Sequence, residues 1–180
     1  MSRMKRYVLT GTPGAGKTAV LRQLERDGFA VVEEAATDVI ALEQAKGVAE
    51  PWTDSAFIDR IIALQSSRQQ RQATGPEEVQ FHDRSAVCTA ALAEWLGYPP
   101  SAGLERELER IERQGIFQRR VFFIRSLGFI KPTEARRISY EAAQRFEQLH
   151  EKVYRQQGFE LIPIEPASVL DRAAAIRRAI

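Results

Sequence analysis

The sequence predicts an α/β fold in which a mainly parallel five-stranded sheet carries helices on both faces. Short apolar segments alternate along the chain with longer segments of helical periodicity. The first apolar segment ends in the glycine-rich stretch GTPGAGKT at 11–18, which opens directly into a helical pattern. Strands that alternate with helices are joined by right-handed crossovers, and these build a parallel sheet that is covered on both sides.

The first half of the chain supplies two strands and three helices. A strand at 6–10 precedes the glycine-rich stretch, and the helix after it ends at Gly28. A second, β-branched strand ends at Val32 and turns through an acidic pair into a helix. A longer helix is expected from Thr53 to Arg71, with its inner side formed by Phe57, Ile61, Ile62 and Leu64.

The second half supplies three more strands, each followed by a helix. The strand VQFHD ends at Asp83, and the apolar face of the next helix consists of Val87, Ala91, Leu92 and Leu96. The segment 120–125 is the fourth strand, and a long helix is expected within 133–158. A fifth strand at 159–164 and a last helix at 168–180 complete the pattern.

The composition is that of one globular domain spanning residues 1–180. Hydrophobic residues make up 44% of the chain and charged residues 28%, which suits a single core. The net charge of +2 shows no bias towards nucleic acid or an anionic membrane, so neither is expected as a partner. With one cysteine, Cys88, and with neither a signal nor a membrane-spanning stretch, a cytoplasmic protein is expected.

The stretch at 11–18 meets the phosphate-binding pattern G-x-x-x-x-G-K-[ST] in full. Such a loop aims backbone N–H groups at a phosphate, and the helix behind it adds about half a positive charge. Lys17 would contact the β- and γ-phosphates, and the Thr18 hydroxyl would hold Mg²⁺. The expected nucleotide-binding residues are Gly11, Pro13, Gly14, Ala15, Gly16, Lys17, Thr18 and Ala19. The cofactors predicted are ATP, with GTP as the alternative, and Mg²⁺.

Asp83 ends a predicted strand and Arg84 follows it, at the edge where ligands of parallel α/β sheets collect. The Asp83 carboxylate suits a metal site shared with Thr18; its alternative role is to cap the following helix, and the two roles are compatible. Arg84 suits a substrate or phosphate contact, the alternative being an exposed arginine at a helix start. Together with Lys17, both are predicted as catalytic residues.

Glu33 and Glu34 end the second predicted strand at the same edge of the sheet. A carboxylate there can accept the proton of a substrate hydroxyl during phosphoryl transfer. The alternative is a pair of surface glutamates at a helix start, which the helix dipole favours. We prefer Glu34 as the general base, since Glu33 continues the alternation of the strand.

A basic segment surrounds the fourth strand and the loop after it. A loop that carries arginines can close over a transferring phosphate, neutralise developing charge and exclude water. A solvated basic face is the alternative, above all for the two arginines that precede the strand. We expect a lid over about 126–138, within a basic set formed by Arg119, Arg120, Arg125, Lys131, Arg136 and Arg137.

On these motifs the chain resembles the P-loop AAA-type ATPase domain family that NadR proteins, in their ribosylnicotinamide kinase part, share with TTD14-like GTP-binding proteins. The resemblance covers most of the chain and is carried by LTGTPGAGKTAVLRQL, GFAVVEEAATDVI, PWTDSAFIDRIIALQ and HDRSAVCTAALAEWLG. It implies a P-loop NTPase fold, kinase-like and with a lid. The triplet at 83–85 also resembles the acidic-Arg-Ser triplet of deoxynucleoside kinases, which implies that Asp83 contacts Mg²⁺ and Arg84 contacts substrate.

The lid of this family commonly reads Asp-Gly-x-Arg before a helix, whereas this chain reads TEARRISYEAAQ and lacks the acidic-glycine pair. The resemblance implies that Arg136 or Arg137 takes the place of the lid arginine, and both are candidates for catalysis.

Two functions follow from these residues. The first is a small-molecule kinase, in which a hydroxyl acceptor of undetermined identity lies between Glu34, the 47–60 segment and Arg84. The alternative is a nucleotide-dependent switch or regulatory ATPase or GTPase that has no acceptor. The chain lacks an Asn-Lys-x-Asp guanine reader, which favours ATP. The near-neutral charge and the short chain argue against a motor stimulated by nucleic acid.

Overall fold

The computed structural model describes residues 4–71, 78–127 and 139–180, and it contains a five-stranded sheet in the order β2-β3-β1-β4-β5. All four neighbouring pairs are parallel, which confirms the predicted parallel sheet. The strands are β1 (Lys5–Gly11), β2 (Ala30–Val32), β3 (Val79–Asp83), β4 (Arg120–Ile124) and β5 (Glu160–Ile164). Parallel strands end at one edge of a sheet, so the loops after β1, β2 and β3 meet there.

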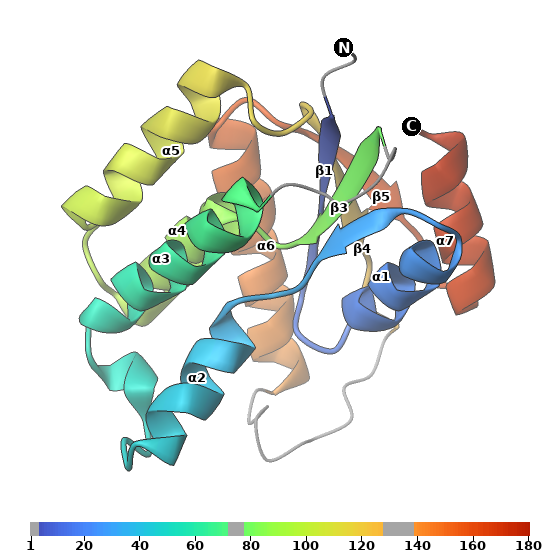
Figure 1. Cartoon of the computed structure of the whole chain (residues 1–180). Helices are drawn as coiled ribbons and strands as arrows, with labels where there is room; N and C mark the ends of the chain where they lie inside the picture. The colour runs from blue at the N-terminus through green and yellow to red at the C-terminus, as the bar shows by residue number, and fades with distance from the viewer. Residues whose placement is uncertain (1–3, 72–77, 128–138) are drawn as a thin grey trace.

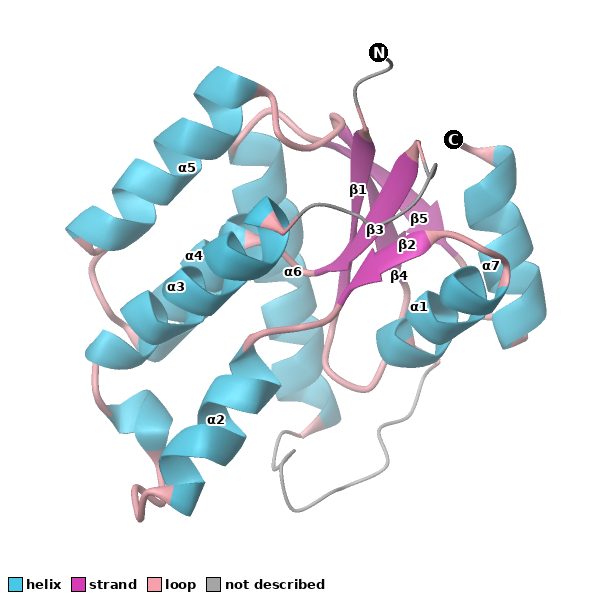
Figure 2. Ribbon diagram, viewed as in Figure 1, coloured by secondary structure: helices cyan, strands magenta, loops and turns pink. Residues whose placement is uncertain are grey.

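Helices cover both faces of the sheet (Figures 1 and 2). One face carries α1 (Lys17–Arg26) and α7 (Val169–Arg178). The other carries α3 (Ala56–Gln70), α4 (Ala86–Leu96), α5 (Ala102–Gln114) and α6 (Tyr140–Gln156). Helix α2 (Ala36–Ala45) packs on α3, and a short 3₁₀ turn, η1 (Pro51–Thr53), lies between them in the chain.

The core has one apolar layer on each side of the sheet because the side chains of a strand alternate between its faces. In β1, Val8 packs among residues of α3, α4, α5 and α6, whereas Tyr7 and Leu9 pack among residues of α1 and α7. Phe81 of β3 and Phe122 of β4 are fully buried on the face of the sheet that α1 and α7 cover. The sheet is therefore a rigid platform for the loops at its carboxyl edge.

Helix α5 is absent from the sequence-based prediction, although its local signals are present. The Ser101 hydroxyl accepts a hydrogen bond from the backbone N–H of Leu104 at 3.1 Å, which caps the start of the helix. Gly115 ends it in the left-handed conformation, with φ of 54°. Leu104 and Ile111 are buried against the layer formed by α3, α4 and α6.

The predicted start of one helix is wrong by a few residues. Helix α3 begins at Ala56 instead of Thr53, because Pro51–Thr53 forms the separate 3₁₀ turn. Helix α6 lies inside the predicted range of 133–158, and the hydroxyl of Ser139 caps its start by accepting a hydrogen bond from the backbone N–H of Ala142. Most of the predicted break at 74–78 and of the predicted lid at 126–138 lies outside the described residues.

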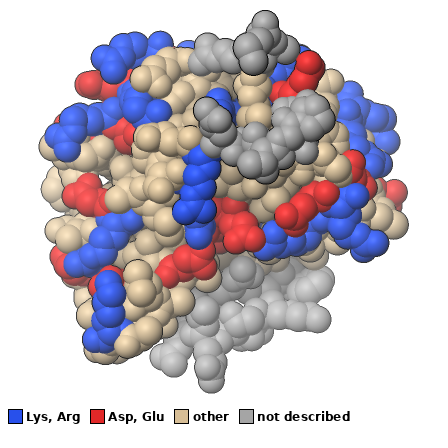
Figure 3. Space-filling view, viewed as in Figure 1, with Lys and Arg blue, Asp and Glu red and all other residues tan. Residues whose placement is uncertain are grey.

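Charged side chains show no single-sign patch on the face drawn in Figure 3, where basic and acidic groups lie interspersed. Many of them form surface ion pairs, such as Lys152 with Glu94 at 2.8 Å. Among the described residues, no helix combines the length and the apolar character that crossing a bilayer requires.

Candidate functional site

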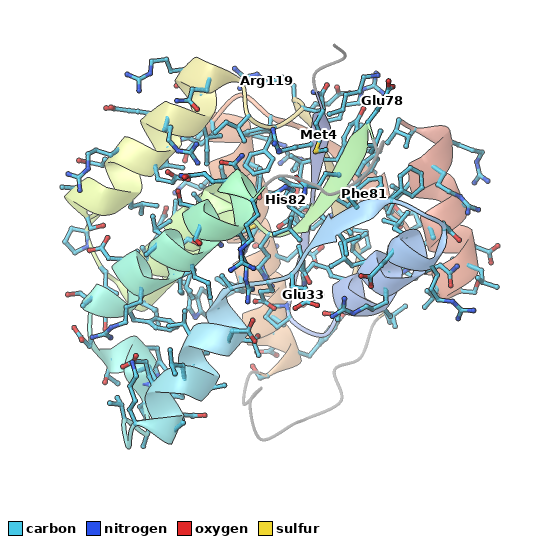
Figure 4. All side chains as sticks on the ribbon, in the orientation of Figure 1. Met4, Glu33, Glu78, Phe81, His82 and Arg119 are labelled. Carbon is cyan, nitrogen blue, oxygen red and sulfur yellow. The ribbon has the colours of Figure 1, made fainter. Side chains whose placement is uncertain are left out.

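Three loops of the carboxyl edge bring most of the predicted site residues together. The phosphate-binding loop follows β1, and the acidic pair follows β2. Asp83 ends β3 and Arg84 follows it, and β3 lies between the other two strands. Glu33 marks this edge in Figure 4, and Arg119 lies at the opposite end of the sheet. The spatial grouping of these three loops therefore matches the grouping expected from sequence.

Glycine is required in the phosphate-binding loop by conformation and by space. Gly11 has φ of 134°, and a Cβ atom at this position would lie 2.3 Å from the carbonyl oxygen of Ile124 in the neighbouring strand β4. Gly14 and Gly16 have φ of 82° and 90°, which L side chains rarely adopt. The glycines thus let the loop curl tightly over the end of the sheet.

Lys17 is the first residue of α1 and lies inside the loop. Its ammonium group donates a hydrogen bond to the carbonyl oxygen of Thr12 at 2.7 Å, and its side chain is buried. Burial and the positive charge of Arg84 lower the pKa of Lys17 to about 8, against the opposing charge of Asp83. A phosphate bound in the loop would add negative charge beside this buried cation and stabilise its protonated form.

Asp83 and Thr18 fit a magnesium ion. The Thr18 hydroxyl lies 3.5 Å from Oδ2 of Asp83, and Oδ1 of Asp83 is buried with no hydrogen-bond partner among the described residues. Burial raises the pKa of Asp83, whereas the charge of Lys17 lowers it. An unpartnered buried carboxylate oxygen beside a hydroxyl is a donor set that Mg²⁺ accepts, because this ion prefers oxygen ligands and is bound by few protein groups besides phosphates.

The alternative role of Asp83 as a helix cap is wrong. Helix α4 is capped by Ser85, whose hydroxyl accepts a hydrogen bond from the backbone N–H of Val87 at 3.3 Å. Ser85 also hydrogen-bonds the hydroxyl of Tyr154 at 2.8 Å. The carboxylate of Asp83 is therefore not needed to start this helix.

Asp83→Asn is expected to weaken the magnesium dependence of nucleotide binding and to leave the fold intact. The amide keeps the shape of the side chain but loses the charge that favours the metal. Nucleotide affinity is measured at a series of Mg²⁺ concentrations, with Asp171→Asn on the exposed start of α7 as the matched control. An unchanged magnesium dependence in Asp83→Asn would contradict the metal assignment.

Arg84 is held by backbone and side-chain contacts in a conformation that is rare for its type. Its φ is 69°, in the left-handed region, and its backbone N–H donates to the carbonyl of Leu9 at 2.9 Å. The guanidinium lies 3.2 Å from the carboxylate of Glu34 and 3.2 Å from Nε2 of His150. Only 9% of the Arg84 side chain is exposed, so it belongs to the site and is not an exposed arginine at a helix start. Strained residues of this kind cluster at functional sites.

His150 orients Arg84 from helix α6. Arginine only donates, so Nε2 of His150 accepts from Arg84 and the proton resides on Nδ1, which donates to the carbonyl of Phe146 at 2.9 Å. The ring packs edge-on against Phe146. Burial and the charge of Arg84 lower the pKa of His150 to about 3. His150 therefore remains a neutral acceptor at any physiological pH.

The neutral state of His150 predicts a loss of stability in acid. The folded-state pKa lies below the value of 6.5 for an unfolded chain, so the stability is complete above pH 6.5 and falls as the pH drops towards 3. Between pH 6 and 4, His150 should contribute a slope of about 1.4 kcal/mol per pH unit to the free energy of unfolding. Urea unfolding of wild type and His150→Gln at several pH values isolates this slope; equal slopes would contradict the assignment.

The two glutamates after β2 have different partners. Glu33 forms an ion pair with Arg22 on α1, and its carboxylate is about half exposed. Glu34 is less exposed and forms the ion pair with Arg84. The sequence-based preference for Glu34 thus agrees with the geometry, since Glu34 is the member of the pair that contacts Arg84.

Arg68 is a contributor to the site that sequence reasoning missed. From helix α3 it donates to the backbone carbonyls of Glu33 at 3.2 Å and Glu34 at 2.5 Å, and it pairs with Asp38 of α2 at 2.5 Å. These hydrogen bonds stabilise the backbone of the turn that contains Glu34. No local pattern reveals this role, because Arg68 lies more than thirty positions from the carbonyls it holds.

A small cavity of about 20 Å³ lies beside Asp83 and Arg84, between β3, α3 and α5. Its lining includes Gln65 and Phe117. None of the described residues that line it comes from the 47–60 segment, against which we expected the acceptor from sequence. A second small cavity, also of about 20 Å³, lies at the other edge of the sheet, near Arg119.

The basic residues expected around a lid do not act as one group. Arg119 and Arg120 lie exposed at the amino end of β4 and donate to the carbonyls of Gln157 and Ala179, which agrees with the alternative given for them, a solvated basic face. Arg125, at the carboxyl end of β4, pairs with Glu147 at 2.9 Å and Glu151 at 2.5 Å on α6. The three remaining members of the set, Lys131, Arg136 and Arg137, lie outside the described residues.

Comparisons with known proteins agree with this fold and with the phosphate-binding loop. Two structures of NadR, one in complex with NAD and AMP-PNP and one with NR, match with TM-scores of 0.69 and 0.68 and 20% identity. They match over 98% of this chain, which spans about half of their own length, 48% and 49%.

Deoxyadenosine kinase from M. mycoides, solved with the products dCMP and dCDP, matches with a TM-score of 0.62 and 13% identity, over 97% of both chains. At these identities the likeness establishes the fold. No curated protein sequence matches the chain.

One family model matches residues 6–172, nearly the whole chain, and it describes an AAA domain. The match includes the phosphate-binding loop, the pair Glu33 and Glu34 after β2, and Asp83 at the end of β3. The family resemblance expected from sequence is thereby confirmed. The chain belongs to the AAA domain family AAA_28, and it is a P-loop nucleotide-binding domain with a kinase-like fold.

Proposed function

We propose that the chain is a small-molecule kinase that transfers the γ-phosphate of ATP to a hydroxyl group. The observation that carries the proposal is the part-buried ion pair of Glu34 and Arg84, 3.2 Å apart, beside Lys17 and Asp83 of the nucleotide site. A kinase requires such a carboxylate near the transferring phosphate, whereas a nucleotide switch does not.

Each residue has a distinct proposed role. Glu34 accepts the proton of the acceptor hydroxyl, and Arg84 orients Glu34 and holds the acceptor or its phosphate. Lys17 contacts the β- and γ-phosphates, and Thr18 and Asp83 would hold Mg²⁺. When bound, Mg²⁺ neutralises negative charge on the phosphates. Arg136 or Arg137 remains the proposed lid arginine, outside the described residues.

Nucleosides are the first acceptor class to examine. The solved structures of similar fold include a deoxyadenosine kinase with dCMP as product and a NadR protein in complex with NR. These two structures support nucleosides as the first acceptor class to screen.

A screen for acceptor-dependent ATP consumption tests the proposal. The protein is mixed with ATP and Mg²⁺ and with single members of a panel of nucleosides, sugars and vitamin precursors. We expect one acceptor class to raise ATP consumption well above the rate without acceptor. Tight nucleotide binding without any active acceptor would instead favour the alternative, a nucleotide-dependent switch or regulatory NTPase.

A further inference from the structure

Arg172 is a buried cation on helix α7 that reaches the phosphate-binding loop across 157 positions of sequence. Only 2% of the residue is exposed. Its Nη1 donates to the carbonyl of Ala15 at 2.7 Å, Nη2 to the carbonyl of Arg125 at 3.0 Å, and Nε to the carbonyl of Glu165 at 3.2 Å. One guanidinium group thus holds three separate segments of backbone.

These three segments follow neighbouring strands of the sheet. Ala15 lies in the loop after β1, Arg125 follows β4, and Glu165 follows β5, and these strands are adjacent in the order β1-β4-β5. A guanidinium is planar and presents its N–H groups in fixed directions. Its three hydrogen bonds therefore fix the relative positions of the loops that follow β1, β4 and β5 at the carboxyl edge of the sheet.

The contact with Ala15 fixes the direction of a phosphate-facing N–H group. The carbonyl of Ala15 and the N–H of Gly16 belong to one planar trans peptide and point in opposite directions. When the carbonyl is bound to Arg172, the N–H of Gly16 is turned away from Arg172. The glycines at 14 and 16 have no side chain to hold this peptide, so an outside contact is needed to hold it.

The charge of Arg172 is not neutralised by a direct ion pair among the described residues. Its three contacts are neutral carbonyl groups, and an arginine in a protein remains protonated. A Cβ atom at Gly16 would lie 3.4 Å from Nη1, so the guanidinium lies directly against the loop. A positive charge at this place favours the phosphates of a bound nucleotide.

We propose that Arg172 is a positioning residue of the nucleotide site, which holds the peptide between Ala15 and Gly16 in its phosphate-binding orientation and adds positive charge behind the loop. This role concerns the polyphosphate of the nucleotide. It holds equally for a kinase and for a switch, so its test is independent of any acceptor.

The test uses Arg172→Met and Arg172→Lys in the whole chain. Arg177→Met is the matched control, because Arg177 lies on the same helix, is exposed and pairs with Asp27 at 2.5 Å. Affinities for Mg-ATP and for inorganic triphosphate are measured by titration calorimetry, and thermal unfolding is followed by circular dichroism. Triphosphate separates effects on the phosphate-binding loop from effects on the base.

Arg172→Met is expected to lower the affinity for ATP and for triphosphate by the same factor, about 10- to 100-fold, which corresponds to losing a hydrogen bond from a charged donor. Arg172→Lys keeps the charge and one contact and should recover part of the loss, and Arg177→Met should bind like wild type.

If Arg172→Met does not fold, a shared loss for both ligands in Arg172→Lys supports the proposal. Wild-type affinities in a folded Arg172 variant, or a loss for ATP alone, would overturn it.

Discussion

Replacing Lys17 by alanine is expected to abolish detectable nucleotide turnover. Its ammonium group lies within the phosphate-binding loop, 2.7 Å from the carbonyl of Thr12, where it can turn to a γ-phosphate. In a site that excludes water, one such contact with developing charge contributes about 3 kcal/mol or more to the rate, by analogy with single donors removed from oxyanion sites. Turnover is measured as ADP formed under saturating Mg-ATP.

A matched lysine controls for the loss of any cationic side chain. Lys152 lies on α6, is half exposed and pairs with Glu94. Because exposed ion pairs contribute little to stability, Lys152→Ala should turn over nucleotide like wild type. Near wild-type turnover in Lys17→Ala, with the same circular dichroism spectrum, would contradict the assignment of the phosphate-binding loop.

Glu34→Gln has the second large expected effect. It should leave ATP affinity nearly unchanged and depress transfer to an acceptor by about 10²- to 10⁴-fold, the usual contribution of a positioned general base. The amide keeps the size of the side chain, and its oxygen can still accept a hydrogen bond from Arg84. Single-turnover transfer and nucleotide affinity are measured side by side on wild type and variant.

The neighbouring glutamate is the matched control for this variant. Glu33 pairs with Arg22 at the surface and should tolerate Glu33→Gln with transfer within about twofold of wild type, because exposed ion pairs contribute little. If transfer survives intact in Glu34→Gln, Glu34 is a strand-end glutamate that only positions Arg84. If both variants lose transfer equally, the acidic turn as a whole is required and neither residue is the specific base.

The phosphate-binding loop could be predicted in detail because its information is local. Its glycines, Lys17 and Thr18 lie within eight residues, and their roles depend on a strand before them and a helix after them. Asp83 was found by a similar argument, since it ends a strand whose neighbour carries the loop. Helix α5 could have been predicted as well, because Ser101 and Gly115 mark both of its ends.

Other parts of the site depend on contacts that no local pattern encodes. His150 meets Arg84 across 66 positions, and Arg68 holds Glu34 across 34. The sequence could nominate Arg84, but its burial and its left-handed backbone follow from the packing of α6 and from the bond to Leu9. The same is true of Arg172, which looks from sequence like one more basic residue on a terminal helix.

Direct transfer of labelled phosphate tests the central claim, that the nucleotide site serves a kinase. Protein in excess over ATP labelled at the γ-phosphate is mixed with Mg²⁺ and the acceptor found by the screen, and the products are identified by mass spectrometry. We predict that the label appears in a phosphate ester of the acceptor as fast as ATP is lost, and that it does not do so in Glu34→Gln. Label that appears only as inorganic phosphate, or ATP that stays bound and intact with every acceptor, would contradict the claim.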